Sequence, residues 1–120
     1  MLFRSRGDVL LCKVPMPSTQ LQQFKIRPAI VVSANELNRV SDDLMVVPCT
    51  SNTKRSISGT QYLITGNETV TIGIRVDSVV RCESIFTVNQ SMVLRRLGVL
   101  DDRTIDRINN CLMAALSLEI

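Results

Sequence analysis

The chain has no histidine and no tryptophan, and aromatic residues make up only 3% of its 120 residues. Without histidine it can build neither a histidine-dependent catalytic triad, nor paired-imidazole ribonuclease chemistry, nor a histidine-ligated zinc site. Proton transfer near neutral pH must therefore use a carboxylate, lysine, cysteine, tyrosine, water or an unusual arginine. With so few aromatic rings, we do not expect a broad platform for stacking nucleobases.

Long hydrophobic runs are missing as well. No stretch approaches the roughly 20 apolar residues that span a bilayer, and no charged start precedes a short apolar segment as in a secretory signal. The four cysteines lie in separate apolar segments, with no pair close enough in sequence for a metal knuckle: Cys12, Cys49, Cys82 and Cys111. We expect buried, reduced thiols, no metal, no cofactor and a soluble protein of the cytoplasm.

Length and composition favour one globular domain over residues 1–120. A chain of this size buries roughly two-thirds of the surface that its unfolded form would expose. The 45% hydrophobic content, mostly valine, isoleucine and leucine, supplies a normal core. A formal net charge of +3 is a hint of a polyanionic partner, although many proteins with this charge bind nothing acidic.

Two strand-like runs organise the chain, residues 26–33 and residues 44–51. Arg27 stands where a loop enters the first run, and Thr50 lies near the exit of the second. If the runs pair antiparallel, Arg27 meets Thr50 across them. An arginine fork beside a hydroxyl suits a phosphate group, because both donate to phosphoryl oxygens. The alternative is that Arg27 is an ordinary solvated surface charge.

The rest of the N-terminal half reads as strand, loop and a short helix. Residues 7–14 are mostly apolar and predict a strand. Residues 15–25 contain two prolines and a polar tract without periodicity, which predicts a long exposed loop. Residues 34–39 predict one or two helical turns that Ser33 could cap. Residues 51–59 form a small, polar and basic loop.

The C-terminal half changes from strand to helix patterns. Residues 61–65 predict a strand that returns through a turn at residues 66–67, and residues 78–85 predict another strand. Residues 89–96 predict a short basic helix. From residue 101 onward, apolar side chains recur at three- and four-residue steps, which predicts a longer helix. Strands thus precede helices, and we expect an α+β domain with a small curled antiparallel sheet capped by a terminal helix.

Four motifs follow one another in register: Gly-Asp-Val at 7–9, Arg-Pro-Ala-Ile-Val-Val-Ser at 27–33, Val-Pro-Cys-Thr-Ser-Asn at 47–52 and Asp-Ser-Val-Val-Arg-Cys-Glu at 77–83. In their order and spacing, and in the junction at 85–101, the chain resembles the MazF/PemK (Kid-like) toxin family of toxin-antitoxin systems. The resemblance implies a small SH3-like antiparallel β-barrel with a C-terminal helix and short additional helices, assembled as a homodimer. It also implies a metal-independent, sequence-specific endoribonuclease for single-stranded RNA (an mRNA interferase), and a cognate antitoxin whose acidic flexible tail covers the RNA groove.

Carried over motif by motif, the resemblance assigns catalysis to Arg27 and Thr50. The lack of histidine agrees with a reaction in which the RNA's own 2′-OH attacks the adjacent phosphate, because the protein then only positions and neutralises. Glu83 is the candidate for taking the 2′-OH proton, although a surface ion pair with Arg81 explains it nearly as well. RNA contacts are expected from Phe24, Ser51, Asn52, Lys54, Arg55, Arg81 and Ser84.

Two other functions stay open. CcdB-like toxins share the fold and bind DNA gyrase without catalysis, but their Trp-Gly-Ile terminus has no counterpart in Leu118-Glu119-Ile120. An inactive RNA-binding relative is the second alternative, against which the retained Arg27, Thr50 and Glu83 argue. The segment before Arg27 lacks the family's glycine, and Ser84 replaces a common glutamine, so the cleavage sequence stays open.

Overall fold

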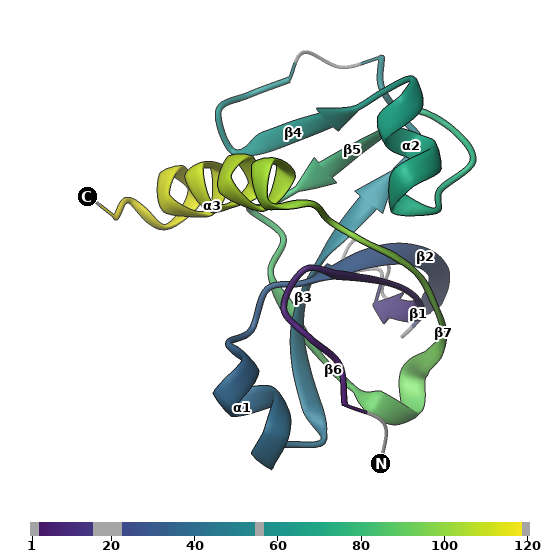
Figure 1. The fold of residues 1–120 in the computed structure, drawn as a ribbon, viewed down its shortest axis with the longest axis vertical. Coiled ribbons are helices and arrows are strands. Elements are labelled where there is room, and N and C mark those ends of the chain that lie inside the picture. The colour runs from purple at the N-terminus through teal and green to yellow at the C-terminus, as the bar shows by residue number, and fades with distance from the viewer. Residues whose placement is uncertain (1–2, 16–22, 55–56, 119–120) are drawn as a thin grey trace.

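The fold is an antiparallel sheet packed against helices, seen in a computed structural model that describes residues 3–15, 23–54 and 57–118. The sheet has seven strands: β1 (Asp8–Pro15), β2 (Phe24–Val31), β3 (Asp43–Thr50), β4 (Gln61–Ile64), β5 (Ser78–Arg81), β6 (Phe86–Asn89) and β7 (Val93–Val99). The helices are α1 (Asn35–Val40), α2 (Asn67–Ile72) and α3 (Asp102–Leu116), with a 3-10 turn η1 at Gln90–Met92. Figure 1 shows α2 and α3 at the end of the molecule that holds β4 and β5, and α1 at the opposite end.

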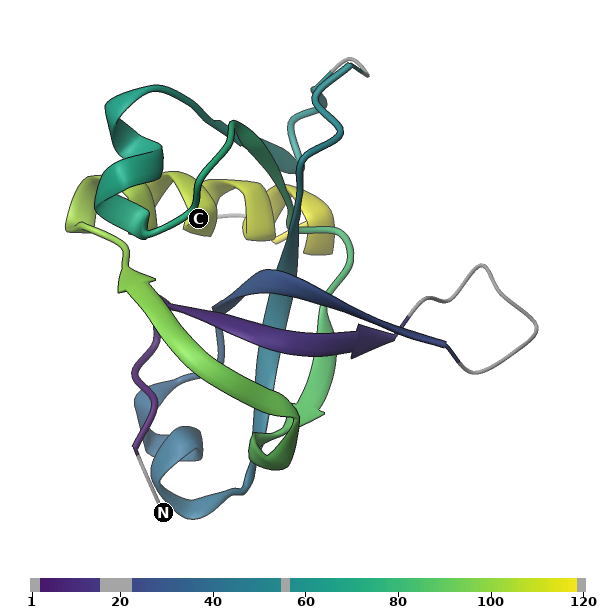
Figure 2. The same cartoon turned by 90° about the vertical axis from the view of Figure 1, so that its right-hand side faces the viewer.

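Strand β3 is the centre of the sheet. One of its edges pairs first with β6 and then, at its last two residues, with β5, while β2 pairs along the other edge. The order along the sheet is β4-β5-β3-β2-β1-β7. Strands β1 and β2 form a long ribbon, from Val9 opposite Ile30 to Pro15 opposite Phe24, which projects from the body of the protein (Figure 2).

Both faces of the sheet are buried, because successive strand residues point to opposite sides. Val9 and Ile30 face one cluster of buried side chains, which includes Ile108 of α3. Leu10 and Ala29 face the other cluster, which β6 closes with Val88. The near-continuous apolar runs in β1, β2 and β3 therefore have a physical cause, since neighbouring positions in the middle of these strands are buried on both sides of the sheet, whereas most of β7 is exposed.

The four cysteines are buried and free, as expected. Cys12 belongs to the cluster of Leu10, whereas Cys49, Cys82 and Cys111 belong to the cluster of Val9. Burial raises the pKa of Cys12 to about 11 and is the main cause that raises the pKa of Cys49 and of Cys82 to about 12. All three thiols are therefore protonated at neutral pH.

Two glycines let the end of α2 contact β7. Gly73 ends α2 in the left-handed region with φ of 85°, which favours glycine. A Cβ atom at Gly73 would lie 2.1 Å from the carbonyl oxygen of Leu97, and one at Gly98 would lie 2.3 Å from the carbonyl oxygen of Ile72. The two backbones approach so closely that neither position has room for a side chain.

Helix α3 is held by polar contacts as well as by its apolar face. The Asp101 carboxylate accepts the backbone N–H of Thr104 at 2.8 Å, which caps the N-terminus of the helix. The Glu68 carboxylate of α2 accepts hydrogen bonds from the hydroxyls of Tyr62, at 2.8 and 2.9 Å, and of Thr104, at 3.0 Å. These bonds connect β4, α2 and α3. Burial, followed by the bond to Glu68, raises the pKa of Tyr62 to about 12.

Several predicted elements are wrong in their bounds or type. Strand β2 begins at Phe24, so the expected loop ends earlier, and residues 16–22 lie outside the described residues. Helix α2 follows β4 where a hairpin return was predicted. Ser33 does not cap α1. Instead, its hydroxyl bonds to the Asn38 side chain and accepts the backbone N–H of Met45.

The largest error concerns residues 89–96, which were predicted to form a basic helix. They form the end of β6, the turn η1 and most of β7. The pairing of β7 with β1 supplies backbone hydrogen bonds that local propensity does not reveal. The strand predicted over residues 78–85 is also shorter, because β5 ends at Arg81 and the chain turns at residues 82–83.

Within the part of the chain that the structure describes, no helix combines the length and the apolar character needed to cross a membrane.

Candidate active site

The register of β2 and β3 brings Arg27 opposite Thr50. The observed pairs, from Val31 with Val46 to Ala29 with Pro48, extend by two residues to that position. Directly opposite residues share a face of the sheet. Both side chains line a hollow of about 480 Å³, together with Lys25, Ser51, Asn52, Ile57, Gln61, Val79 and Arg81. We call it the active-site hollow.

The guanidinium group of Arg27 is available for a ligand. The residue is half-buried in β2, and its backbone is fixed opposite Cys12 of β1. Its side chain makes no hydrogen bond or ion pair with any residue that the structure describes. Among the described residues that line the active-site hollow, Lys25, Arg27 and Arg81 are cations and none is a carboxylate. Positive charge without a local counter-charge suits a phosphate, and the planar fork of arginine matches two phosphoryl oxygens.

The hydroxyl group of Thr50 is oriented by the turn that follows β3. Its Oγ1 atom accepts the backbone N–H of Asn52 at 3.3 Å. A hydroxyl carries one hydrogen and two lone pairs, so accepting this bond leaves its own hydrogen free to donate. Thr50 can therefore donate to an oxygen placed between it and Arg27.

The loop after β3 adds polar groups on one side of the active-site hollow. Ser51 and Asn52 are exposed and line it. The Asn52 side chain accepts the backbone N–H of Lys54 at 3.4 Å, which bends the loop. Lys54 is exposed and does not line the hollow, and Arg55 lies outside the described residues.

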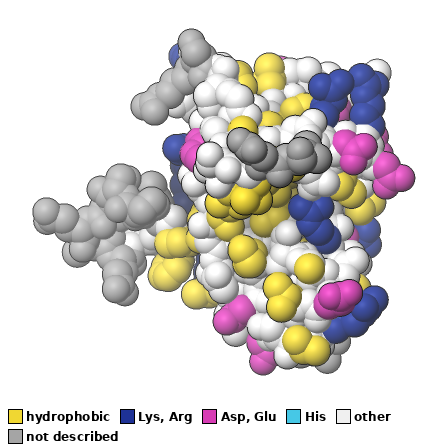
Figure 3. All heavy atoms as spheres, turned by 90° about the vertical axis from the view of Figure 1, so that its left-hand side faces the viewer, with side chains coloured by type: hydrophobic (Ala, Val, Ile, Leu, Met, Phe, Trp, Pro, Cys, Tyr) yellow, Lys and Arg dark blue, Asp and Glu magenta, His cyan; other side chains and the backbone are white. Residues whose placement is uncertain are grey.

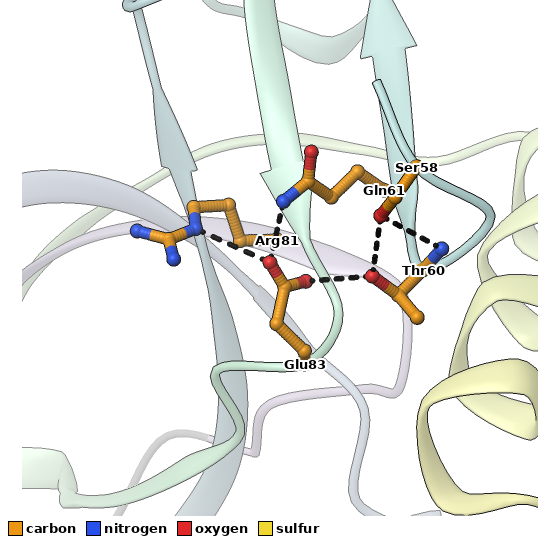
Figure 4. Close-up of polar contacts among 5 residues, drawn as sticks. All are labelled: Ser58, Thr60, Gln61, Arg81 and Glu83. Carbon is orange, nitrogen blue, oxygen red and sulfur yellow. Dashed lines mark hydrogen bonds and ion pairs between the residues drawn. The ribbon is translucent and has the colours of Figure 1, made fainter. Parts of the chain in front are cut away.

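Glu83 is close to Arg81 but is not a lining residue of the active-site hollow. Its carboxylate accepts hydrogen bonds from Gln61 Nε2 at 2.5 Å, from Thr60 Oγ1 at 3.2 Å and from Arg81 Nε at 3.4 Å (Figure 4). Burial acts to raise the pKa of Glu83, but the hydrogen bonds from Gln61, from its own backbone, from Arg81 and from Thr60 lower it overall. A carboxylate with these donors and a lowered pKa is a weaker base than free glutamate.

Arg81 connects Glu83 to the active-site hollow. Only its Nε atom is directed at Glu83, and the two terminal nitrogens point away from that carboxylate (Figure 4). The pair is largely exposed, which gives it little value for stability. It can nevertheless fix the direction in which the Arg81 fork points.

Besides Lys54, two more predicted RNA contacts lie outside the active-site hollow. Phe24 is 53% exposed at the start of β2, and Ser84 is half-buried with its backbone N–H bonded to the Arg81 carbonyl. Conversely, sequence reasoning missed Lys25 and Gln61 as lining residues. Lys25 stands two positions before Arg27, so a strand assignment beginning at Phe24 would have placed both on one face.

The described residues contain no cluster of three or more histidine, cysteine, aspartate or glutamate side chains that could hold a metal ion. The chemistry of the active-site hollow is therefore that of arginine, lysine, hydroxyl and amide donors. Taken together, the curled antiparallel sheet and this hollow define an α+β protein whose candidate site, beside β2 and β3, presents donors suited to a phosphate.

Comparison with known proteins identifies the family. Residues 5–116 match the family described as PemK-like, MazF-like toxin of type II toxin-antitoxin system. The match covers nearly the whole chain, so the chain belongs to this family, which confirms the resemblance found in its motifs.

Individual relatives agree with this assignment. The endoribonuclease EndoA of Bacillus subtilis (strain 168) is 26% identical over 113 residues, which are 94% of each chain. A solved endoribonuclease from Mycobacterial species superposes with a TM-score of 0.76 at 25% identity, covering 100% of this chain and 97% of that chain. An endoribonuclease solved in complex with its cognate antitoxin, also from Mycobacterial species, superposes with a TM-score of 0.75 at 25% identity, and 98% of each chain is covered.

Solved structures with lower sequence identity have a similar fold. MazF from Deinococcus radiodurans is 18% identical and superposes with a TM-score of 0.75 over 98% of this chain and 100% of that chain. At this identity the likeness concerns the fold alone. The expected α+β fold, a small antiparallel sheet with a C-terminal helix, is confirmed.

Proposed function

We propose that the chain is the toxin of a type II toxin-antitoxin pair and a sequence-specific, metal-independent endoribonuclease that cleaves single-stranded RNA in the cytoplasm. The observation that carries the proposal is that Arg27 and Thr50 line one hollow, whose described lining residues include no carboxylate. The family membership and the endoribonucleases among the relatives support the same activity. We further propose that residues 1–120 act as one domain.

In the proposed reaction, the 2′-OH of the RNA attacks the adjacent phosphorus. A bond forms between the 2′-oxygen and phosphorus, the bond to the 5′-oxygen breaks, and the products end in a 2′,3′-cyclic phosphate and a 5′-hydroxyl. Arg27 holds the non-bridging oxygens and compensates the charge that gathers on them, while Thr50 donates to the same group. A guanidinium group does not give up its proton in proteins, so we assign Arg27 to charge compensation rather than to the removal of a proton.

The acceptor of the 2′-OH proton is a separate question. Glu83 stays a predicted base, but its geometry favours another role, since three side chains already donate to its carboxylate. We propose that Glu83 mainly orients Arg81 toward the RNA. The proton of the 2′-OH then passes to water at the mouth of the hollow, and water returns one to the leaving 5′-oxygen.

The test begins with purified wild-type protein and RNA, followed by sequencing of the new 5′ ends. Cleavage at a recurring sequence is expected to persist in excess EDTA, because no described lining residue of the active-site hollow offers a carboxylate for a divalent cation. A single 2′-deoxynucleotide on the 5′ side of the scissile phosphate should abolish cleavage, since it removes the nucleophile.

Arg27→Ala, purified in the same way, controls for contaminating ribonucleases. Normal cleavage of the deoxy-substituted RNA, or equal cleavage by the Arg27→Ala protein, contradicts the proposal. Binding of RNA without cleavage would instead indicate an inactive RNA-binding relative.

We also propose a homodimer. The described surface exposes large apolar side chains on the last turn of α3 and beyond it, at Leu116 and Leu118, and on β7, at Leu94 and Val99. Figure 3 shows hydrophobic side chains gathered over the middle of the face toward which α3 runs. Exposed apolar patches of this kind mark protein contacts, and a second copy of the chain is the simplest symmetric partner.

The second proposed partner is a cognate antitoxin with an acidic flexible tail. A mycobacterial relative was solved in complex with its cognate antitoxin. A basic hollow without stacking aromatics binds its ligands through charge, so an acidic segment and RNA would compete for it. The check is competition: an antitoxin that binds while RNA stays bound contradicts a shared groove.

A further inference from the structure

A second hollow lies beside the active-site hollow. Its volume is about 340 Å³, and it shares Lys25, Arg27 and Ser51 with the first. Its far wall comes from β7 and from the segment between α2 and β5, which contribute Arg95 and Arg75. We call it the flank hollow. The two hollows adjoin at these three shared residues, although most of their walls come from different elements.

Local backbone geometry brings Arg75 and Arg95 to the same place. Two irregularities in the pairing of β1 with β7 put Arg95 opposite Leu11, which in turn is opposite Pro28 of β2. Gly73 contacts the backbone of β7 at Leu97, and Arg75 follows it by two residues. The close approach of α2 and β7 therefore draws two arginines, distant in sequence, to one hollow.

The charges in the flank hollow are uncompensated. None of the described residues that line it is a carboxylate, and the side chains of Arg75 and Arg95 make no hydrogen bond or ion pair with any group that the structure describes. The neighbouring Arg96 behaves differently, because it lies 3.4 Å from the Asp8 carboxylate. Guanidinium groups that share a hollow without a counter-ion repel one another, and a ligand with several negative charges removes that repulsion.

The flank hollow also exposes apolar surface between its cations. Ile26 is 52% exposed and Val76 is 56% exposed, and both line it. A single RNA strand has this combination of features, since phosphates alternate with sugars and bases that pack on apolar side chains. A strand held at Arg27 must leave the active-site hollow, and the flank hollow opens from the same residues.

We propose that the flank hollow binds the nucleotides next to the scissile phosphate, with Arg75 and Arg95 contacting two flanking phosphates of the same RNA strand. The inference rests on the proposed function and extends it: the substrate is a strand longer than the cleaved sequence. An acidic protein segment is the competing occupant, and the sharing of Arg27 with the active-site hollow favours RNA.

The test compares two RNAs that contain the mapped cleavage sequence. The short RNA ends at that sequence, and the long RNA extends it by about eight nucleotides on each side, within the span that such domains cover. For wild type and for Arg75→Gln/Arg95→Gln, the ratio of kcat/KM between long and short RNA is measured. Loss of two phosphate contacts should lower this ratio on the order of 20-fold at about 0.1 M salt, and should reduce the salt slope of long-RNA binding by about 1.4.

Arg103→Gln/Arg107→Gln is the matched control. It removes the same charge from two exposed arginines of α3, which line a different hollow that contains Glu68 and Asp101. Its ratio should stay within about twofold of wild type. Circular dichroism of both double variants checks that they are folded.

The outcomes separate the two proposals. If Arg75→Gln/Arg95→Gln keeps the wild-type ratio, the flank hollow does not bind RNA. If the same variant keeps that ratio and loses binding of an acidic antitoxin peptide, the occupant is protein and the inference is overturned. If the wild-type protein cuts neither the short nor the long RNA, the proposed function itself fails.

Discussion

Replacing Gly73 by alanine should destabilise the protein more than the same change at Gly98 or Gly59. An alanine at φ of 85° is strained by about 1–2 kcal/mol. Its Cβ would also lie 2.1 Å from the Leu97 carbonyl oxygen, so that α2 or β7 must shift. Forced overpacking of this kind typically costs about 1–3 kcal/mol, which brings the expected loss for Gly73→Ala to about 2–5 kcal/mol.

The other two glycines separate these contributions. Gly98 has an ordinary φ but would place Cβ 2.3 Å from the Ile72 carbonyl oxygen, so Gly98→Ala should lose only the packing part, about 1–3 kcal/mol. Gly59 has an ordinary φ and nothing within 4 Å of a built Cβ. Gly59→Ala should change the free energy of unfolding by less than about 1 kcal/mol, in the stabilising direction.

The assay is urea unfolding followed by far-UV circular dichroism. All variants are compared at one protein concentration, because self-association makes the unfolding midpoint depend on concentration. Equal free energies of unfolding for Gly98→Ala and Gly59→Ala would refute the close approach of α2 and β7. Because that approach also forms the flank hollow, Gly98→Ala should lower the ratio of long- to short-RNA cleavage as well.

Four further predictions concern the site and the assembly. Arg27→Ala and Thr50→Ala should each slow single-turnover cleavage by about 10²-fold or more, while RNA binding weakens much less. If Arg27→Ala weakens RNA binding as much as it slows cleavage, Arg27 contacts the phosphate equally in the ground state and is not specific to the transition state. Glu83→Gln should slow cleavage by less than about tenfold, to about the same extent as Arg81→Ala. If instead the cleavage rate falls by about 10²-fold or more and the acid limb of the rate–pH profile disappears, Glu83 is the general base. The lowered pKa of Glu83 also sets the direction of its effect on stability. The hydrogen bonds to its carboxylate stabilise the fold above the ordinary glutamate pKa, and this stabilisation is lost as the pH falls through the lowered pKa. Tyr62 is the chain's single tyrosine, and its phenolate absorbance should rise near pH 12 in the folded protein but near 10.0 in denaturant. Burial and then the bond to Glu68 raise this pKa, so the stability that they give to the protonated form is complete below pH 10.0 and is lost toward pH 12. A native midpoint near 10.0 would contradict both the burial of the ring and the bond. Light scattering should give about twice the monomer mass of 13.4 kDa, and a monomer at micromolar concentration would exclude the dimer.

The proximity of Arg27 and Thr50 could be predicted because one fixed offset relates all residue pairs of two antiparallel strands. Once residues 26–33 and 44–51 were taken as antiparallel neighbours, the offset that pairs apolar residues also pairs Arg27 with Thr50, and the structure has this register. The start of β2 could not be predicted in the same way. Phe24 and Lys25 follow a polar tract, and their pairing with Pro15 and Val14 of β1 comes from a partner strand that local composition does not reveal.

The two helix errors have opposite causes. Helix α2 contains Thr69, Val70, Thr71 and Ile72, β-branched residues that locally favour a strand. It is helical because Ile72 is buried in the core and the Thr69 hydroxyl bonds to the Gly66 carbonyl. Residues 93–97, by contrast, have good helix formers in Leu94, Arg95 and Arg96, yet they pair with β1 because that edge would otherwise leave its backbone groups unpaired.

The buried cysteines make the protein its own reporter of local opening. A thiol shielded from water and kept protonated reacts with labelling reagents only when the structure around it opens. Cys12 lies in one buried cluster, while Cys49, Cys82 and Cys111 lie in the other. The order in which these four sites become labelled would therefore show which side of the sheet opens first, without any introduced probe.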